Sequence, residues 1–258
     1  MSPTEIPLLT VKDFAFSYPQ RLADMKWRIE IPNLELHRNH IYSLFGSNMS
    51  GKSTLLRILA GLENVRTVDR SCKFFLGGSL IDSSPVKKID SFRSLPVRDL
   101  MLLAHSDQMF PSLTVWENVA VVGNRMLYGG ASEARHRLLG FLEKCGLKEH
   151  KVSPSTFLQD LSSGAQAFIR LARSYCCNSK ILLIDEVTGQ LDDSNASIFF
   201  NVLNEVLPLD AAVVLVSHHQ RDHQIASDLA QSRCSGYTKL IINESETNGE
   251  RLSCVQLG

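Results

Sequence analysis

The sequence predicts an α/β protein with buried parallel strands, and two segments carry this prediction. Residues 41–45 form an apolar run that leads through a glycine-bounded loop into the helical pattern of residues 55–60, which Gly61 can end. Residues 181–184 form a second apolar run, and two carboxylates follow it, as expected of a buried parallel strand with polar groups at its carboxyl end. Strands and helices that alternate in this way favour a sheet covered by helices.

The loop after the first run fits the phosphate-binding pattern G-x-x-x-x-G-K-[ST]. A strand, a loop and a helix N-terminus in this order aim backbone N–H groups and the helix dipole at the α- and β-phosphates of a nucleotide. Lys52 would reach the β- and γ-phosphates, and Ser53 would coordinate Mg²⁺. The alternative is an ordinary glycine-containing turn. It is disfavoured because the apolar run before the loop and the helical pattern after it are the strand and helix that the motif requires. The loop residues expected to contact nucleotide are Gly46, Ser47, Asn48, Met49, Ser50, Gly51, Lys52, Ser53 and Thr54.

The two carboxylates after the second run predict a hydrolytic site. Asp185 would hold Mg²⁺ through water, and Glu186 would polarise the attacking water. Two acidic residues after a strand could also merely cap the next helix. The nucleotide interpretation is favoured because a second candidate phosphate-binding helix N-terminus, capped by Ser162, lies 23 residues upstream of Asp185 (185 minus 162).

That segment, Leu-Ser-Ser-Gly-Ala-Gln at residues 161–166, resembles the L-S-G-G-Q signature of the ATP-binding-cassette (ABC) ATPases. Ser162 and Gly164 match the signature, whereas Ser163 replaces a glycine and Ala165 replaces the glutamine. In the family, this helix N-terminus binds the γ-phosphate of a nucleotide held by the opposite subunit. The resemblance therefore implies ATP and Mg²⁺ as cofactors, a second ATPase subunit as partner, and nucleotide contacts from Ser162, Ser163 and Gly164.

The start of the chain is expected to supply strands and a contact to the base. Strands are expected at residues 8–11, 27–31 and 34–36. Residues 16–19, Phe-Ser-Tyr-Pro, resemble the aromatic loop of the family, in which a tyrosine stacks on adenine. A flat amphipathic ring suits a base platform, so Tyr18 is expected to stack, with a half-buried strand position as the alternative.

One position departs from the family pattern where the core meets the helical part. In the family, a glutamine at the end of the strand expected at residues 100–104 senses Mg²⁺ and water. In the family this glutamine lies six residues before the proline of a Phe-Pro pair, which is Pro111 here. Counted without gaps (111 minus 6), the position is His105, and Gln108 falls three residues inside the loop. A neutral imidazole can accept a hydrogen bond or approach a cation, which favours His105 over Gln108 as the metal-sensing residue, although its charge depends on pH. A plain surface histidine is the remaining possibility.

The middle of the chain predicts a helical subdomain. Residues 114–117, Thr-Val-Trp-Glu, fit a capping box, and helical patterns follow at residues 132–145 and after Ser162. We expect one nucleotide-binding domain, residues 1–258, with a core of residues 1–108 and 176–258 and a helical insertion at about residues 109–175. In the family, this insertion docks onto membrane subunits. The sequence offers three candidates for exposed docking residues, for which burial is equally compatible: Phe110, Val115 and Trp116.

Two more family motifs follow the carboxylates. Residues 187–192 occupy the place of the D-loop, so Asp192 is expected near the nucleotide, and their T-G-Q-L-D letters resemble the T-G-N-L-D of lipoprotein-releasing, macrolide-exporting and cell-division ATPases. His218 lies 32 residues after Glu186 (218 minus 186), behind the apolar run of residues 211–216, and fits the switch histidine that contacts the γ-phosphate. A histidine after a strand is usually structural, but four other motifs in order favour the phosphate contact.

Composition limits the classes of partner and the cellular compartment that are expected. The chain has 258 residues, with 27 basic and 27 acidic side chains, so no electrostatic feature suggests nucleic acid. The six cysteines show no metal-binding spacing, which favours a reducing cytosol. We expect neither a targeting segment nor a membrane span, and the 40 residues after His218 (258 minus 218) should leave no room for an appended regulatory domain.

The resemblance covers essentially the whole chain and implies a P-loop NTPase of ABC type, with a mostly parallel core sheet, an antiparallel β patch and an inserted helical subdomain. It implies a cytoplasmic ATP-hydrolysing subunit, peripheral on a membrane, with Lys52, Glu186 and His218 as catalytic residues. Two such subunits would sandwich two ATP and drive separate transmembrane permease subunits. The alternatives are a non-transport mechanical ATPase acting on a membrane complex, and a weakly hydrolysing regulatory module suggested by Ser163, Ala165 and His105.

Overall fold

A single mixed sheet of ten strands runs through the described part of the chain. The computed structural model describes residues 6–17, 26–62, 73–81, 100–104, 109–121, 127–148, 151–233, 235–247 and 250–258. The strands are β1 (Leu9–Phe16), β2 (Lys26–Leu36), β3 (His40–Phe45), β4 (Lys73–Leu76), β5 (Ser79–Ile81), β6 (Leu100–Ala104), β7 (Ile181–Asp185), β8 (Ala212–Val216), β9 (Gly236–Thr247) and β10 (Glu250–Leu257). Their order across the sheet is β5-β4-β1-β2-β10-β9-β3-β8-β7-β6.

The sheet combines a parallel half with a largely antiparallel half. Pairing is parallel from β6 through β7, β8 and β3 to β9. Pairing is antiparallel between β1 and β2, β1 and β4, β4 and β5, and β9 and β10, whereas β10 pairs with β2 in parallel. The sequence predicted both kinds of pairing, but it did not predict that the antiparallel strands continue the parallel ones in one sheet.

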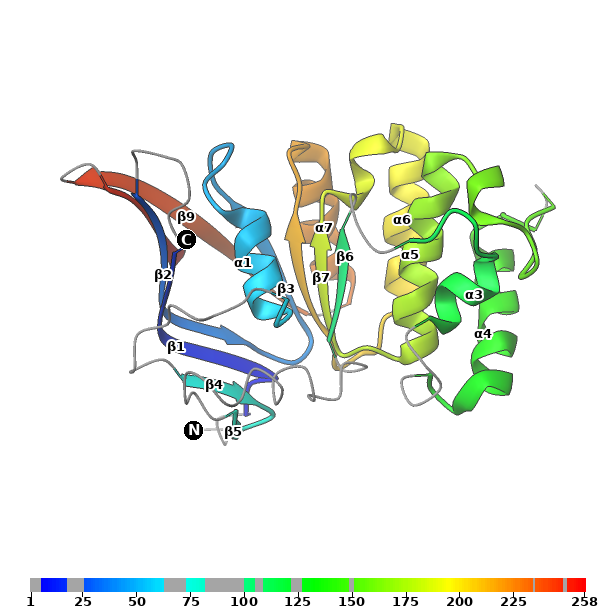
Figure 1. Cartoon of the computed structure of the whole chain (residues 1–258), viewed down its shortest axis with the longest axis horizontal. Helices are drawn as coiled ribbons and strands as arrows, with labels where there is room; N and C mark the ends of the chain where they lie inside the picture. The colour runs from blue at the N-terminus through cyan, green and yellow to red at the C-terminus, as the bar shows by residue number, and fades with distance from the viewer. Residues whose placement is uncertain are drawn as a thin grey trace.

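Helices cover both faces of the parallel half (Figure 1). They are α1 (Lys52–Leu59), α3 (Val115–Ala120), α4 (Gly130–Lys144), α5 (Ser163–Cys177), α6 (Asp193–Val206) and α7 (Gln220–Ser232), with short 3₁₀ turns η2 (Leu158–Asp160) and η3 (Val187–Gln190). Figure 1 shows α1 in the angle between the two halves of the sheet, and α3 to α6 gathered at the end opposite β1, β2, β4 and β5.

Strand periodicity divides the apolar interior into two clusters. In β7, Leu182 and Ile184 join the cluster formed with α3 to α7, whereas Ile181 and Leu183 join the cluster formed with α1. Successive side chains of a strand point to opposite faces, so a continuous apolar run is what a strand needs when both of its faces are covered. The apolar runs of the sequence therefore predicted the parallel strands correctly.

One expectation about the strands was wrong. Residues 27–31 and 34–36 were expected to be separate strands, but β2 runs continuously from Lys26 to Leu36. Pro32 has no N–H to donate to a ladder. The pairing with β1 skips Pro32 and Asp13, and Asp13 adopts a left-handed φ of 50°. The ladder resumes beyond this local irregularity, so the strand survives its proline.

The helical part follows its local signals. Thr114 accepts a hydrogen bond from the Glu117 N–H at 3.2 Å while the Glu117 carboxylate accepts one from the Thr114 N–H at 2.8 Å, which confirms the capping box.

Of the three candidates for exposure, Phe110 is 47% exposed, Val115 is fully buried, and Trp116 is partly buried against the core. In the part of the chain that is described, no helix combines the length and apolar character of a membrane span.

The contact between α5 and α6 provides a test of this packing. Phe199 of α6 is fully buried, and its ring centroid lies 5.7 Å from that of Phe168 in α5. Phe199→Ala should lower the free energy of unfolding by about 3–5 kcal/mol, because it leaves a cavity. Ile198→Ala, at the neighbouring 39% exposed position, should change it by only about 0.5 kcal/mol. Equal denaturation midpoints for the two variants would contradict the packing described here.

Candidate nucleotide-binding site

The loop between β3 and α1 has the backbone shape that a phosphate-binding loop requires. Gly51 precedes α1 with a φ of 99°, and a Cβ at this position would lie 2.6 Å from the Trp27 ring. A Cβ on Gly46 would lie 2.6 Å from Ser50 Oγ. Both glycines therefore allow approaches that other residues would obstruct. Gly51 provides no side-chain cap and the first turn of α1 contains no acidic residue, so the positive end of this helix faces no competing anion from its own turn.

Lys52 points back over the loop. Its Nζ donates hydrogen bonds to the carbonyl oxygens of Gly46 at 2.9 Å and Ser47 at 2.7 Å, and the side chain is only 6% exposed. Burial lowers the pKa of Lys52, and the nearby carboxylates of Glu186, Asp185 and Glu244 act in the opposite direction. A buried ammonium held by carbonyl oxygens can exchange them for phosphate oxygens, which form stronger charge-assisted hydrogen bonds.

Ser53 and Asp185 meet beside the loop. The Ser53 hydroxyl donates to Asp185 Oδ1 at 3.1 Å, from the first turn of α1 to the carboxyl end of β7. Burial raises the pKa of Asp185, and the hydrogen bond from Ser53 opposes that shift. A hydroxyl and a carboxylate are oxygen donors of the type that Mg²⁺ prefers, and this ion usually completes its coordination with substrate phosphates and water. The pair therefore fits a magnesium site.

Glu186 and His218 lie side by side at the same edge of the sheet. His218 Nε2 is 2.7 Å from Glu186 Oε1, and both side chains are half-exposed. They follow β7 and β8, whose parallel register pairs Asp185 with Val216. The Glu186 N–H also donates to the Val216 carbonyl at 3.0 Å, and Glu186 adopts a left-handed φ of 54°. The structure thus brings together two residues that are 32 positions apart.

The N-terminus of α5 is capped as the sequence predicted. Ser162 Oγ accepts a hydrogen bond from the Ala165 N–H at 3.2 Å, and the first turn contains no acidic residue. Ser163 and Gly164 form the start of the helix. The amide of Gln166, in contrast, donates to the carbonyl oxygens of Leu158 at 3.3 Å and Leu161 at 3.1 Å. This amide supports the preceding turn and does not cap the helix.

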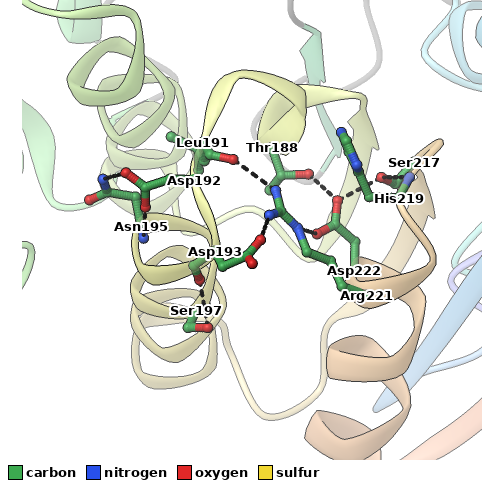
Figure 2. A network of polar contacts seen from close by, with 10 residues as sticks. All are labelled: Thr188, Leu191, Asp192, Asp193, Asn195, Ser197, Ser217, His219, Arg221 and Asp222. Carbon is green, nitrogen blue, oxygen red and sulfur yellow. Dashed lines mark hydrogen bonds and ion pairs between the residues drawn. The ribbon is translucent and has the colours of Figure 1, made fainter.

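Several residues that were predicted to contact nucleotide or metal either make other contacts or lie outside the described residues. Asp192 caps α6, because its carboxylate accepts a hydrogen bond from the Asn195 N–H at 2.8 Å, and this bond lowers its pKa (Figure 2). Its expected contact with nucleotide stays a prediction. Tyr18, His105 and Gln108 lie outside the described residues.

Sequence reasoning missed Glu244, which reaches the loop from β9. Its carboxylate accepts a hydrogen bond from the Ser47 hydroxyl and forms an ion pair with Arg251 of β10. Residue 241 of β9 pairs with Phe45, so the continuation of β9 passes the loop that follows β3. No local pattern could reveal this contact, since 197 residues separate its partners.

Phosphate-binding geometry at the carboxyl edge of a parallel sheet defines the class of P-loop nucleotide-binding proteins. A sequence model described as ABC transporter matches residues 29–189, or 161 of the 258 residues (189 minus 29, plus 1). The chain therefore belongs to the ABC transporter family. This match confirms the family resemblance drawn from the motifs.

Curated relatives agree with this assignment at modest identity. The chain is 25% identical over 188 residues to the L-arabinose transport ATP-binding protein AraG of Geobacillus stearothermophilus, covering 72% of this chain and 34% of that protein. It is 27% identical over 240 residues to ABC transporter H family member 2 of Dictyostelium discoideum, covering 84% and 45%. The match to the glutamine transport ATP-binding protein GlnQ of G. stearothermophilus is 26% and covers 72% of each. The chain thus spans less than half of the first two relatives.

Solved structures confirm the fold class. A dimeric structure of the ATP-binding cassette MJ0796 in a post-hydrolysis state, bound to ADP and phosphate, superposes with a TM-score of 0.65 at 22% identity, covering 94% of this chain and 95% of that one. A nucleotide-free ATP-binding cassette from an ABC transporter gives a TM-score of 0.64 at 15% identity, covering 95% and 89%. At these identities the likeness concerns the fold.

The raised pKa of Asp185 yields a pH-dependent prediction for the nucleotide-free protein. The folded protein binds a proton at Asp185 more tightly than the unfolded chain does, so the ionised carboxylate costs stability above both pKa values. Asp185→Asn removes that cost and can still accept the Ser53 hydrogen bond. The variant should unfold at higher denaturant concentration at neutral pH in EDTA, with an advantage that shrinks as pH falls through the raised pKa.

Asp160→Asn, at an exposed carboxylate, serves as the matched control and should change little. An Asp185→Asn variant that is less stable than the wild type at neutral pH would show that its site favours the charged form.

Proposed function

We propose that this chain is the ATP-hydrolysing subunit of an ABC transporter and that two copies, or this chain and a related partner, sandwich two ATP molecules. The observation that carries the proposal is the Glu186–His218 pair, 2.7 Å apart, at the edge that also holds Lys52 and Asp185. A group that can orient water lies beside groups that can stabilise phosphate charge. This combination is what phosphoryl transfer to water needs, because its catalysis is mostly positioning and electrostatics.

Nucleotide binding rests on the loop and on Lys52. Backbone N–H groups of residues 46–54 would surround the β-phosphate, and Lys52 would leave the carbonyl oxygens of Gly46 and Ser47 for the β- and γ-phosphates. Ser53 and Asp185 would hold Mg²⁺, which when bound neutralises charge on the phosphate oxygens. Tyr18 as base platform and His105 or Gln108 as metal sensor remain part of the proposal from sequence alone.

Hydrolysis adds water to the γ-phosphorus and breaks the bond to the β-phosphate. The Glu186 carboxylate accepts a hydrogen bond from the attacking water and orients it. In the nucleotide-free protein this carboxylate faces His218. His218 would turn to the γ-phosphate when ATP binds, which frees Glu186 for water and adds a donor to the phosphate charge.

The remaining parts of the proposal concern partners. The capped, acid-free N-terminus of α5, with Ser162, Ser163 and Gly164, suits the γ-phosphate of a nucleotide held by a second subunit, and Asp192 would lie near the same interface. The helical part, about residues 109–175, would dock onto separate permease subunits through exposed groups such as Phe110. The chain would then be cytoplasmic and peripheral on the membrane. The division into a core and a helical insertion within one domain belongs to this proposal.

A weakly hydrolysing regulatory module is the second candidate, and one observation favours it. Ser163 and Ala165 replace signature residues, and the Gln166 amide is already engaged by Leu158 and Leu161. A signature without a free amide offers less to the partner's nucleotide.

Glu186→Gln tests the proposed hydrolysis. The substitution keeps the shape of the side chain and removes the carboxylate, so phosphate release at saturating MgATP should fall by roughly 100-fold or more. ATP binding should persist, and an ATP-bound dimer should accumulate on size-exclusion chromatography. Glu205→Gln, at an exposed carboxylate paired with Lys144, is the control and should retain turnover. Near wild-type turnover of Glu186→Gln would exclude Glu186 as the group that orients water.

The variant signature generates a separate prediction. Ser163 adds a Cβ where glycine allows a closer backbone approach, and Ala165 lacks an amide. In a homodimer both sites share these changes, so Ser163→Gly with Ala165→Gln should raise the basal rate of phosphate release at saturating MgATP. An unchanged unfolding temperature would show that the double variant is folded. A folded double variant with the same or a lower rate would show that the altered signature is already adapted to its site.

A further inference from the structure

A buried carboxylate connects the two segments that carry Glu186 and His218 (Figure 2). Asp222, in the first turn of α7, is fully buried. Its Oδ2 accepts hydrogen bonds from the Thr188 hydroxyl at 2.5 Å and from the Ser217 hydroxyl at 2.6 Å. Thr188 lies two residues after Glu186, and Ser217 immediately precedes His218. One oxygen atom therefore joins the segments on both sides of the proposed reactive pair.

Further contacts fix the orientation of this connection. Ser217 Oγ donates its hydrogen to Asp222 and accepts one from the His219 N–H at 3.0 Å, which fixes the hydroxyl and the backbone next to His218. His223 Nε2 lies 2.9 Å from the Ser217 carbonyl oxygen. The hydroxyl and the carbonyl oxygen of Ser217 are thus both held by residues of α7.

Arg221 adds a second connection around the first. Its Nη2 donates to the Leu191 carbonyl at 2.8 Å, its guanidinium forms an ion pair with Asp193, and its Nε donates to Asp222 Oδ1 at 3.3 Å. The segment that follows Glu186 is therefore tied to α7 at both Thr188 and Leu191. The guanidinium also provides a cation for the buried carboxylate, which would otherwise be costly to desolvate.

We propose that Asp222 is a positioning residue for ATP hydrolysis, which sets the placement of Glu186 relative to His218 through Thr188 and Ser217. The inference rests on the proposed hydrolytic function. A displacement of about 1 Å at reacting groups can cost on the order of 100-fold in rate, so a fixed link between the two segments has a direct kinetic effect. Neither Thr188 nor Asp222 has to touch the nucleotide, and their removal should leave ATP binding through the loop intact.

The test begins with two hydroxyl deletions that keep side-chain volume or reduce it slightly. Thr188→Val and Ser217→Ala should each lower kcat for phosphate release by about tenfold or more, with the KM for MgATP changed by less than about threefold. Asp222→Asn should do the same, because an amide cannot accept both hydroxyl donors as the carboxylate does. Thr188→Ser, which restores the donor, should recover most of the turnover lost in Thr188→Val. Ser197→Ala removes an exposed hydroxyl of α6 that bonds to the Asp193 carbonyl, and it should leave kcat unchanged (Figure 2).

A second measurement separates positioning from a general loss of stability. If Asp222 acts through Glu186, Thr188→Val should cause little further loss in a Glu186→Gln background, because the group being positioned is already gone. The same fold loss in both backgrounds would overturn the positioning role. So would a loss in Thr188→Val that Thr188→Ser does not recover.

The outcomes also distinguish this inference from the proposed function. Full activity of folded Thr188→Val and Ser217→Ala, alongside an inactive Glu186→Gln, would overturn the role of Asp222 and leave the hydrolytic function standing. Full activity of Glu186→Gln would overturn the hydrolytic role of that residue, and the positioning role of Asp222 would fall with it.

Discussion

Parallel pairing of β3, β8 and β7 is the constraint on which the site depends. It places the carboxyl ends of three strands next to one another, with Leu44 beside Val216 and Val216 beside Asp185. The phosphate-binding loop leaves the first strand, His218 follows the second and Glu186 follows the third. A register shift of one residue would turn each side chain to the opposite face and exchange side chains between two clusters, each of which is packed around its own set. Burial of the strands therefore also fixes the positions of the catalytic candidates.

Because the carboxyl ends of these three strands are adjacent, several charged side chains lie close together in the nucleotide-free site. Lys52 lies within the electrostatic influence of Glu186, Asp185 and Glu244, while its own ammonium is held by loop carbonyl oxygens. Burial lowers the pKa of Lys52 and raises the pKa of Asp185, so it favours the neutral form of each group. A bound nucleotide with its metal would replace these internal contacts by stronger ones. A bound nucleotide would add phosphate oxygens as direct anionic partners of Lys52, and a bound metal would add a direct cationic partner for Asp185.

The segment from η3 to the start of α6 has a structural role besides its expected place near the nucleotide. Asp192 caps α6, and Thr188 and Leu191 are bonded to α7. These contacts make the peptide after Glu186 a fixed part of the core. Any movement of this segment on nucleotide binding would have to involve α7 and the backbone next to His218, which is the physical basis for treating the two catalytic candidates as one unit.

The sequence by itself determined the features whose chemistry is local. The loop at residues 46–53, the apolar runs of β7 and β8, and the capping box at Thr114 each depend on neighbours a few residues away, and all were predicted correctly. The order of motifs also gave the family and the candidates Lys52, Asp185, Glu186 and His218.

Only the tertiary structure decided which distant segments meet. Glu244 reaches Ser47 across 197 positions, and Asp222 reaches Thr188 across 34. It also decided that Val115 is buried while Phe110 is exposed, and that β2 continues past Pro32. Each of these depends on packing or strand pairing with residues remote in the chain. A periodicity or a motif spacing is read within one short stretch of sequence, so it does not show which distant residue that stretch will contact.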